Sequence, residues 1–113
     1  MYRKSEKFAD KAAQAWPILR YNASLKQTMT YQELARRLYG TDARRVMGAI
    51  LGHIARYCTA NGLPQLNVIV VNKQTRRPGY SIPLASKDFD EMTERVFAFD
   101  WNTISAPTAA MLA

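Results

Sequence analysis

The sequence predicts one small α+β domain, in which helices come first and a β-hairpin follows. Its 113 residues are enough for a single hydrophobic core, and 48% of them are hydrophobic, as in globular proteins. Apolar residues recur at helical spacing before residue 60, and a β-branched run over residues 68–71 comes after it. We expect residues 1–100 to form the domain and residues 101–113, rich in Ala and Thr, to be a frayed C-terminal tail.

The first predicted helix spans residues 5–21. Its inward positions, at three- and four-residue spacing, should be Phe8, Ala12, Ala15, Trp16 and Leu19. Pro17 should kink or restart this helix, because proline lacks the backbone N–H that the helix interior uses. A polar connection over residues 22–28 should follow.

A capping box predicts where the second helix begins. Thr30 and Glu33 have the Ser/Thr-x-x-Glu spacing, in which each side chain accepts a hydrogen bond from the other residue's backbone N–H. The helix should span residues 31–38 and end at Gly40. Its inward residues should be Leu34, Ala35 and Leu38.

The longest helix is expected over residues 43–60, with Thr41 or Asp42 as its cap and Asn61-Gly62 at its end. Its apolar stripe comprises Val46, Met47, Ile50, Leu51, Ile54 and Cys58. The opposite side is unusually small, with Gly48, Ala49 and Gly52 between Arg45 and Arg56. Such a face would allow close approach to DNA or, equally, tight packing against another helix.

The second half of the chain predicts a hairpin and a last helix. Residues 66–72 are rich in β-branched side chains, residues 73–79 contain the turn formers Pro78 and Gly79, and residues 80–82 could return as the partner strand. A short acidic helix over residues 87–97 should follow, with Ser86 as its cap. The aromatic residues expected in or beside the core are Trp16, Phe97, Phe99 and Trp101.

This order of elements is that of a winged helix-turn-helix, whose second helix enters the major groove of DNA while the hairpin contacts the backbone. Arginines in the first turn of the long helix would contact base edges or phosphates. Basic residues of the second helix and of the hairpin tip would contact phosphates, unless they are only solvated surface, and the tyrosine that starts the second helix would contact the DNA backbone or pack across the helix start. The expected nucleic-acid-binding residues are Tyr31, Arg36, Arg37, Arg44, Arg45, Gly48, Arg56, Lys73, Arg76 and Arg77.

The distribution of charge favours a polyanionic partner. The chain has 16 Lys and Arg against 9 Asp and Glu, a net charge of +7. Residues 1–85 hold 14 of the bases and 4 of the acids, a net +10, whereas residues 86–113 hold 2 bases and 5 acids, a net −3. We therefore expect duplex DNA as the partner of the basic part, and the acidic segment 87–100 folded over the basic face to weaken non-specific binding.

A resemblance to a known family supports this expectation. The residues Thr30-Tyr31-Gln32-Glu33-Leu34-Ala35, then Gly40, then Ala43-Arg44-Arg45-Val46-Met47-Gly48-Ala49 resemble the DNA-binding half of alkylguanine-DNA alkyltransferases and alkyltransferase-like proteins. The resemblance implies that Arg44 fills the gap left by a flipped nucleotide and that Tyr31 presses on the target phosphate. Residues 62–73 and 78–80 also resemble a small uncharacterised family of bacterial and phage proteins.

The catalytic motif of the alkyltransferases is missing. Where that family has Pro-Cys-His-Arg, this chain continues from Pro64 with Gln65, Leu66 and Asn67. Cys58 lies on the predicted apolar face of a helix, where thiols are usually inert. Alkyl transfer by a cysteine nucleophile is therefore not expected, and a regulator or an accessory factor in DNA transactions is the function that the sequence favours.

Other chemistry finds little support in the sequence. A single cysteine and a single histidine, His53, exclude a disulfide framework and a Cys- or multi-His-based metal site, and no phosphate-binding or nucleophile motif is present. The acids Asp88, Asp90, Glu91 and Glu94 are predicted to be the exposed face of a helix and not a metal site. We expect no cofactor.

Two alternatives to DNA binding remain open. One is an inhibitor or immunity-type factor of phage or mobile-element origin, whose basic surface would meet an acidic protein. The weaker one is a small nuclease or toxin that uses His53 as general base. The longest apolar run, residues 68–71, is far too short to span a bilayer, and residues 1–10 contain no secretory signal, so a cytoplasmic protein is expected.

Overall fold

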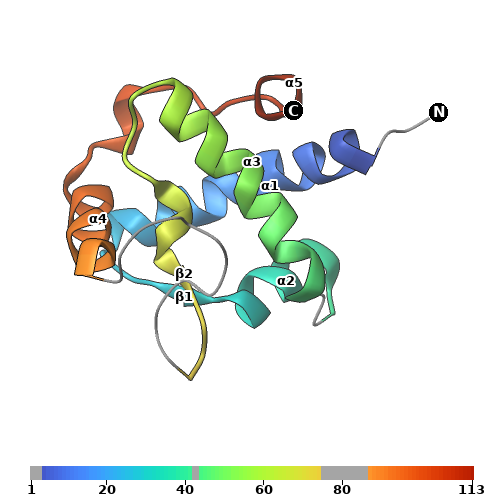
Figure 1. The fold of residues 1–113 in the computed structure, drawn as a ribbon, viewed down its shortest axis with the longest axis horizontal. Coiled ribbons are helices and arrows are strands. Elements are labelled where there is room, and N and C mark those ends of the chain that lie inside the picture. The colour runs from blue at the N-terminus through green and yellow to red at the C-terminus, as the bar shows by residue number, and fades with distance from the viewer. Residues whose placement is uncertain (1–3, 42–43, 75–86) are drawn as a thin grey trace.

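Helix α1 (Lys4–Ser24) is the element on which the others pack. In the computed structural model, which describes residues 4–41, 44–74 and 87–113, α1 contacts α2 (Tyr31–Tyr39), α3 (Met47–Ala60), α4 (Lys87–Ala98) and α5 (Ala109–Leu112) (Figure 1). Its fully buried residues are Ala9, Ala12, Ala15, Trp16, Leu19 and Ala23. The expected inward face is thus confirmed, with Phe8 half-buried at its edge.

Pro17 does not interrupt α1, contrary to the expectation from the sequence. The helix continues through it to Ser24, three residues beyond the predicted end. The proline ring lies on the exposed side of the helix, whereas Trp16 and Leu19 on either side of it are fully buried. Burial of this face holds the helix together although proline removes one backbone hydrogen bond.

Helix α2 begins and ends where the sequence predicts. The Glu33 backbone N–H donates to Thr30 Oγ1 (3.2 Å) and the Thr30 backbone N–H donates to Glu33 Oε1 (3.1 Å), which completes the capping box. Gly40 ends the helix with a φ of 73°, a left-handed conformation that glycine adopts without steric cost. The inward residues Leu34, Ala35 and Leu38 are buried as expected.

Helix α3 starts later than the sequence predicts. A 3₁₀ turn, η1 (Arg44–Val46), precedes it, and Val46 stands at its N-cap without a side-chain hydrogen bond. Thr41 therefore does not cap α3, and Asp42, the other expected cap, lies outside the described residues. The stripe of Met47, Ile50, Leu51, Ile54 and Cys58 is buried as expected, with Val46 half-buried, and Asn61 and Gly62 follow the helix end.

The β-rich run over residues 66–72 is mostly not a strand. Leu66–Ile69 form a 3₁₀ helix, η2, and only Val70–Val71 form a strand, β2. Leu66, Val68, Ile69 and Val70 are all fully buried, so the apolar run reflects burial on every side and not the alternation of a half-buried strand. Strand β2 pairs in parallel with β1 (Met29–Thr30), in the register Met29–Val70 and Thr30–Val71, and the expected hairpin partner at residues 80–82 lies outside the described residues.

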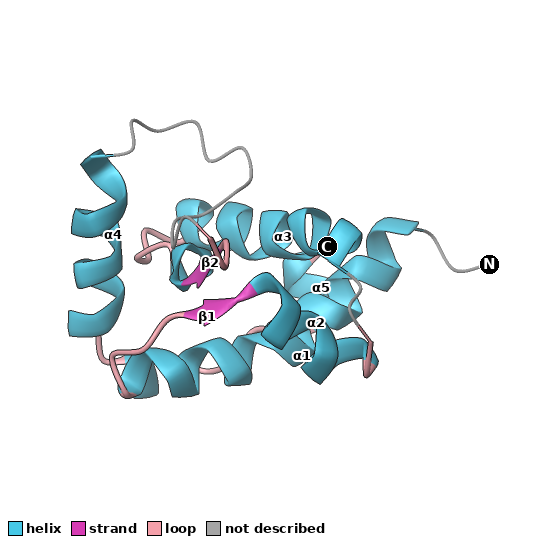
Figure 2. Ribbon diagram, turned by 90° about the horizontal axis from the view of Figure 1, so that it is seen from below, coloured by secondary structure: helices cyan, strands magenta, loops and turns pink. Residues whose placement is uncertain are grey.

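The C-terminal segment is folded and not frayed. Helix α4 covers the predicted acidic helix and packs against η2 and α1, with Val96 fully buried, whereas its expected cap Ser86 lies outside the described residues. The chain then forms a 3₁₀ turn, η3 (Trp101–Thr103), and α5, which packs against α1 and α3 (Figure 2). Trp101 is 3% exposed and Leu112 is 2% exposed. Burial of these two large apolar side chains in the core stabilises the segment after residue 100 in its folded form.

We expect the substitution Thr30→Ala to lower the free energy of unfolding by about 1 kcal/mol, because it removes the side-chain acceptor of the α2 capping box. Urea denaturation followed by circular dichroism measures this change. Thr41→Ala, at an exposed threonine just beyond α2, is the control and should change stability by less than about 0.5 kcal/mol. Equal effects of the two substitutions would show that the capping box contributes nothing specific.

Candidate nucleic-acid interface

Exposed arginines gather at the end of the molecule formed by α2 and the start of α3. Arg36 and Arg37 lie in the last turn of α2, and Arg45 lies in η1; all three side chains are exposed. None of them forms an ion pair with a described residue. Like charges that gather without acidic partners repel each other, so this surface is well suited to a polyanion that would neutralise it.

The parallel strand pair brings a further cation close to the N-terminus of α2. Strand β1 leads directly into α2, and β2 lies beside it in the same direction, so the chain leaves β2 next to the start of α2 (Figure 1). The exposed Lys73 follows β2 by two residues. Arg76 and Arg77, expected at the hairpin tip, lie outside the described residues.

A lysine of α1 holds the end of α2 in place. Lys11 Nζ donates a 2.9 Å hydrogen bond to the carbonyl oxygen of Leu38 and lies 4.7 Å from the centre of the Tyr39 ring. The ammonium group thus satisfies a carbonyl in the last turn of α2 and lies at the negative end of the helix dipole. Sequence analysis missed this residue, since no local pattern connects positions 27 residues apart.

The small face of α3 is open over Ala49, which is exposed, whereas Gly48 and Gly52 are half-buried. A methyl group added at Gly52 would lie 3.3 Å from Arg56 Nη1, so the glycine makes room for that guanidinium. Arg56 Nη2 lies 3.2 Å from His53 Nδ1, and the Arg56 side chain is exposed whereas His53 is buried. Arg56 is therefore next to His53, on the side of α3 that faces the C-terminal segment.

Tyr31 and Arg44, two further residues of the expected interface, do not add exposed side chains to it in the described part of the chain. Tyr31 is 7% exposed and belongs to the hydrophobic core, which corresponds to the packing role that the sequence left open for it. Arg44 has its backbone in η1, and its side chain lies outside the described part of the chain. Arg45 is thus the arginine that the structure places, exposed, at the start of α3.

His53 joins α3 to the end of the chain. Its side chain is 5% exposed, and its Nδ1 lies 2.6 Å from the carbonyl oxygen of Leu112, so Nδ1 carries the proton and donates it. The same nitrogen then cannot accept from Arg56. The imidazole therefore links α3 to α5 by a hydrogen bond. Because the side chain is almost fully buried, a substrate in solvent has little access to it.

Cys58 is buried on the core side of α3 as expected. Burial raises the pKa of its thiol to about 11, although a hydrogen bond from the Leu66 backbone has the opposite, smaller effect. The thiol is therefore protonated at neutral pH and unsuited to nucleophilic chemistry.

The acidic helix does not cover the basic end. In both views α4 lies at one end of the molecule and is separated from α2 by the strand pair, and α4 packs on η2 and α1 through apolar residues such as Val96 (Figures 1 and 2). The acids Asp90, Glu91 and Glu94 are exposed there, and Glu91 accepts a 2.8 Å hydrogen bond from Arg95. No group of three His, Cys, Asp or Glu in the described ranges is arranged to hold a metal ion.

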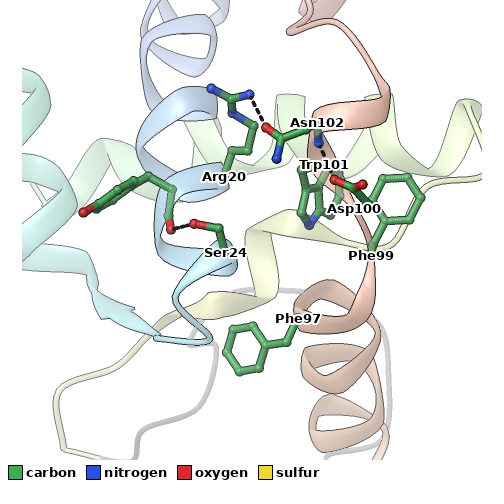
Figure 3. A pocket seen from close by; sticks show the side chains of 8 residues that line it. Arg20, Ser24, Phe97, Phe99, Asp100, Trp101 and Asn102 are labelled. Atoms are coloured by element: carbon green, nitrogen blue, oxygen red, sulfur yellow. Dashed lines mark hydrogen bonds between the residues drawn. The ribbon is translucent and has the colours of Figure 1, made fainter.

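A cavity of about 290 Å³ lies near α4, away from the arginine-rich end. Its walls come from the C-terminal part of α1, the end of α4 and η3 (Figure 3). Arg20, Asp100 and Asn102 provide polar groups, and Phe97, Phe99 and Trp101 provide aromatic ones. Sequence analysis assigned Phe97, Phe99 and Trp101 only to the core and its edge, and it had no signal that would join Arg20 to residues more than 75 positions later.

Comparisons with protein-family models, with curated proteins and with solved structures found no match. Within the described ranges, no helix is long and apolar enough to cross a membrane.

We expect Cys58 to react slowly with a water-soluble thiol reagent in the folded protein at pH 7 to 9, because its pKa of about 11 leaves almost no thiolate there. The rate should increase as the pH approaches 11 and should rise steeply at pH 8 once denaturant unfolds the chain. Absorbance of the released reagent group measures both rates. A fast reaction of the native protein at pH 8 would contradict the burial of this thiol.

Proposed function

We propose that the protein binds duplex DNA through α2, η1 with the start of α3, and the chain that follows β2. The observation that carries the proposal is the set of exposed arginines Arg36, Arg37 and Arg45, which form no ion pair with a described residue. Phosphate contacts from such side chains supply most of the non-specific affinity of a protein for DNA.

In this proposal α2 and α3 act as a helix-turn-helix. The connection between α2 and η1 consists of residues 40–43 and begins with Gly40 in a left-handed conformation, as is typical of this motif. Helix α3 is the recognition helix, and Arg45 at its start would contact base edges or phosphates in the major groove. The exposed Ala49, one turn further along, lets the helix lie close to the groove wall.

The wing in this proposal is the chain that follows β2. The parallel pairing of β1 and β2 supports it, because this pairing delivers Lys73 beside the start of α2. Arg76 and Arg77 would extend the contact along the phosphate backbone. The positive charges of α2 and of the chain that follows β2 would then contact the same stretch of duplex.

Charge separation along the molecule further supports the proposal. Helix α4, which carries exposed acids, is separated from α2 by the strand pair (Figure 1), so it would not come between the arginines and bound DNA. Such an arrangement orients the protein in the field of a polyanion before contact and speeds productive association. We infer a binding protein and not an alkyltransferase, because Pro-Cys-His-Arg is missing and Cys58 is buried.

We expect Arg37→Gln and Arg45→Gln each to weaken binding to a short random-sequence duplex roughly tenfold, since each removes a charge-assisted hydrogen bond to phosphate or base. Each lost phosphate contact should also reduce the slope of log K against log salt concentration by about 0.9. Fluorescence anisotropy between about 50 and 200 mM salt measures both quantities.

The matched control is Arg95→Gln on α4, which makes the same change of charge away from α2 and η1. It should leave the affinity within about twofold and the salt slope unchanged. Equal losses from Arg95→Gln and Arg45→Gln would show that only net charge matters. Binding to poly-glutamate as tight as binding to DNA would favour an acidic protein as the partner and overturn the proposal.

A further inference from the structure

The cavity between α1 and η3 is lined by charged and by aromatic side chains. Figure 3 shows Arg20 and Asn102 at the top, Asp100, Trp101 and Phe99 on the side formed by η3 and the chain before it, Phe97 at the bottom, and Ser24 on the wall formed by α1. Its volume of about 290 Å³ is at the lower end of the range for small-ligand sites and suits a molecule the size of one large amino acid. The cavity therefore offers both charged groups and aromatic rings to a small ligand.

Two opposite charges line the cavity, on either side of Asn102. Arg20 Nη1 donates a 3.1 Å hydrogen bond to Asn102 Oδ1, and Asp100 Oδ1 accepts a 3.1 Å hydrogen bond from the Asn102 backbone N–H. Because both charged residues hold the same asparagine, they are close to each other, yet they form no ion pair. The guanidinium keeps further N–H donors and the carboxylate keeps its second oxygen for a ligand.

The aromatic walls are held rigidly. Trp101 Nε1–H donates a 2.9 Å hydrogen bond to the carbonyl oxygen of Val96. The Trp101 ring makes edge-to-face contacts with Phe99, at 4.6 Å between ring centres, and with the buried Trp16, at 5.7 Å. Such fixed rings lose little entropy when an apolar group enters beside them.

We propose that this cavity binds a free α-amino acid with a large apolar side chain. The ligand carboxylate would pair with Arg20, its ammonium group with Asp100, and its side chain would pack against Phe97 and Phe99. Only a ligand that carries both charges on neighbouring atoms and an apolar body satisfies both charged residues and the aromatic walls together. This site lies apart from the arginine-rich end and does not depend on DNA binding.

Isothermal titration calorimetry of the full chain at pH 7 with L-phenylalanine and L-leucine tests the proposal, with the fluorescence of the two tryptophans, Trp16 and Trp101, as a second signal. We expect saturable binding of one molecule per chain. The analogues 3-phenylpropionate, which lacks the ammonium group, and 2-phenylethylamine, which lacks the carboxylate, should each bind at least about tenfold more weakly, since each loses one charge-assisted contact.

Arg20→Gln and Asp100→Asn should each reduce the affinity for L-phenylalanine at least about tenfold. Asparagine at position 100 can still cap η3, so the second variant should remain folded. The controls Arg95→Gln and Glu94→Gln make the same charge changes outside the cavity and should bind L-phenylalanine as the parent protein does. No saturable binding of either amino acid up to about 10 mM, equal binding of an analogue, or unchanged affinity of Asp100→Asn would overturn the proposal.

Discussion

The buried face of α1 is the constraint on which the rest of the structure depends. Trp16 is fully buried and meets Tyr57 of α3 and Trp101 of η3 edge to face, so one side chain connects the first, middle and last parts of the chain. An interior proline costs about 3 kcal/mol. Burial of Trp16 and Leu19 on the same face together contributes about 3 to 6 kcal/mol, which offsets that cost. The helix therefore stays continuous, and every other helix is placed against it.

Because α1 is continuous, it also links the two surfaces to which we assign function. Lys11 holds the end of α2 through Leu38, and Arg20, nine residues further along the same helix, forms part of the cavity. The two positions are roughly 13 Å apart along the helix axis. A rigid helix of this kind keeps the arginine-rich end and the amino-acid cavity at a constant separation.

In the described part of the chain, the tertiary structure keeps the acidic helix away from the arginines of α2 and η1. Helix α4 was expected to cover the basic face, but its apolar residues pack on η2 and α1, and the strand pair lies between α4 and α2. Apolar burial is worth more than exposed ion pairs, which contribute little in water. The arginines of α2 and η1 are left available to a partner, as DNA binding requires.

The sequence by itself determined the features that local interactions control. The capping box at Thr30, the end of α2 at Gly40, the buried stripe of α3 and the extent of α4 all followed from neighbours within a few residues, and the structure confirms them. Arg36, Arg37 and Arg45 are exposed, as expected for residues outside the apolar faces that the sequence predicts for these helices.

Only the tertiary structure decided the features that depend on distant contacts. The 3₁₀ form of η2, the parallel pairing of β2 with β1, the packing of α5 with Leu112 in the core, and the joining of Arg20 to Asn102 depend on residues far apart in the chain. A fully buried apolar run has no periodicity that separates strand from 3₁₀ helix, and a short polar segment gives no sign that its few apolar residues complete a core. Long-range burial selects among local conformations of similar energy, and it placed both candidate sites on this fold.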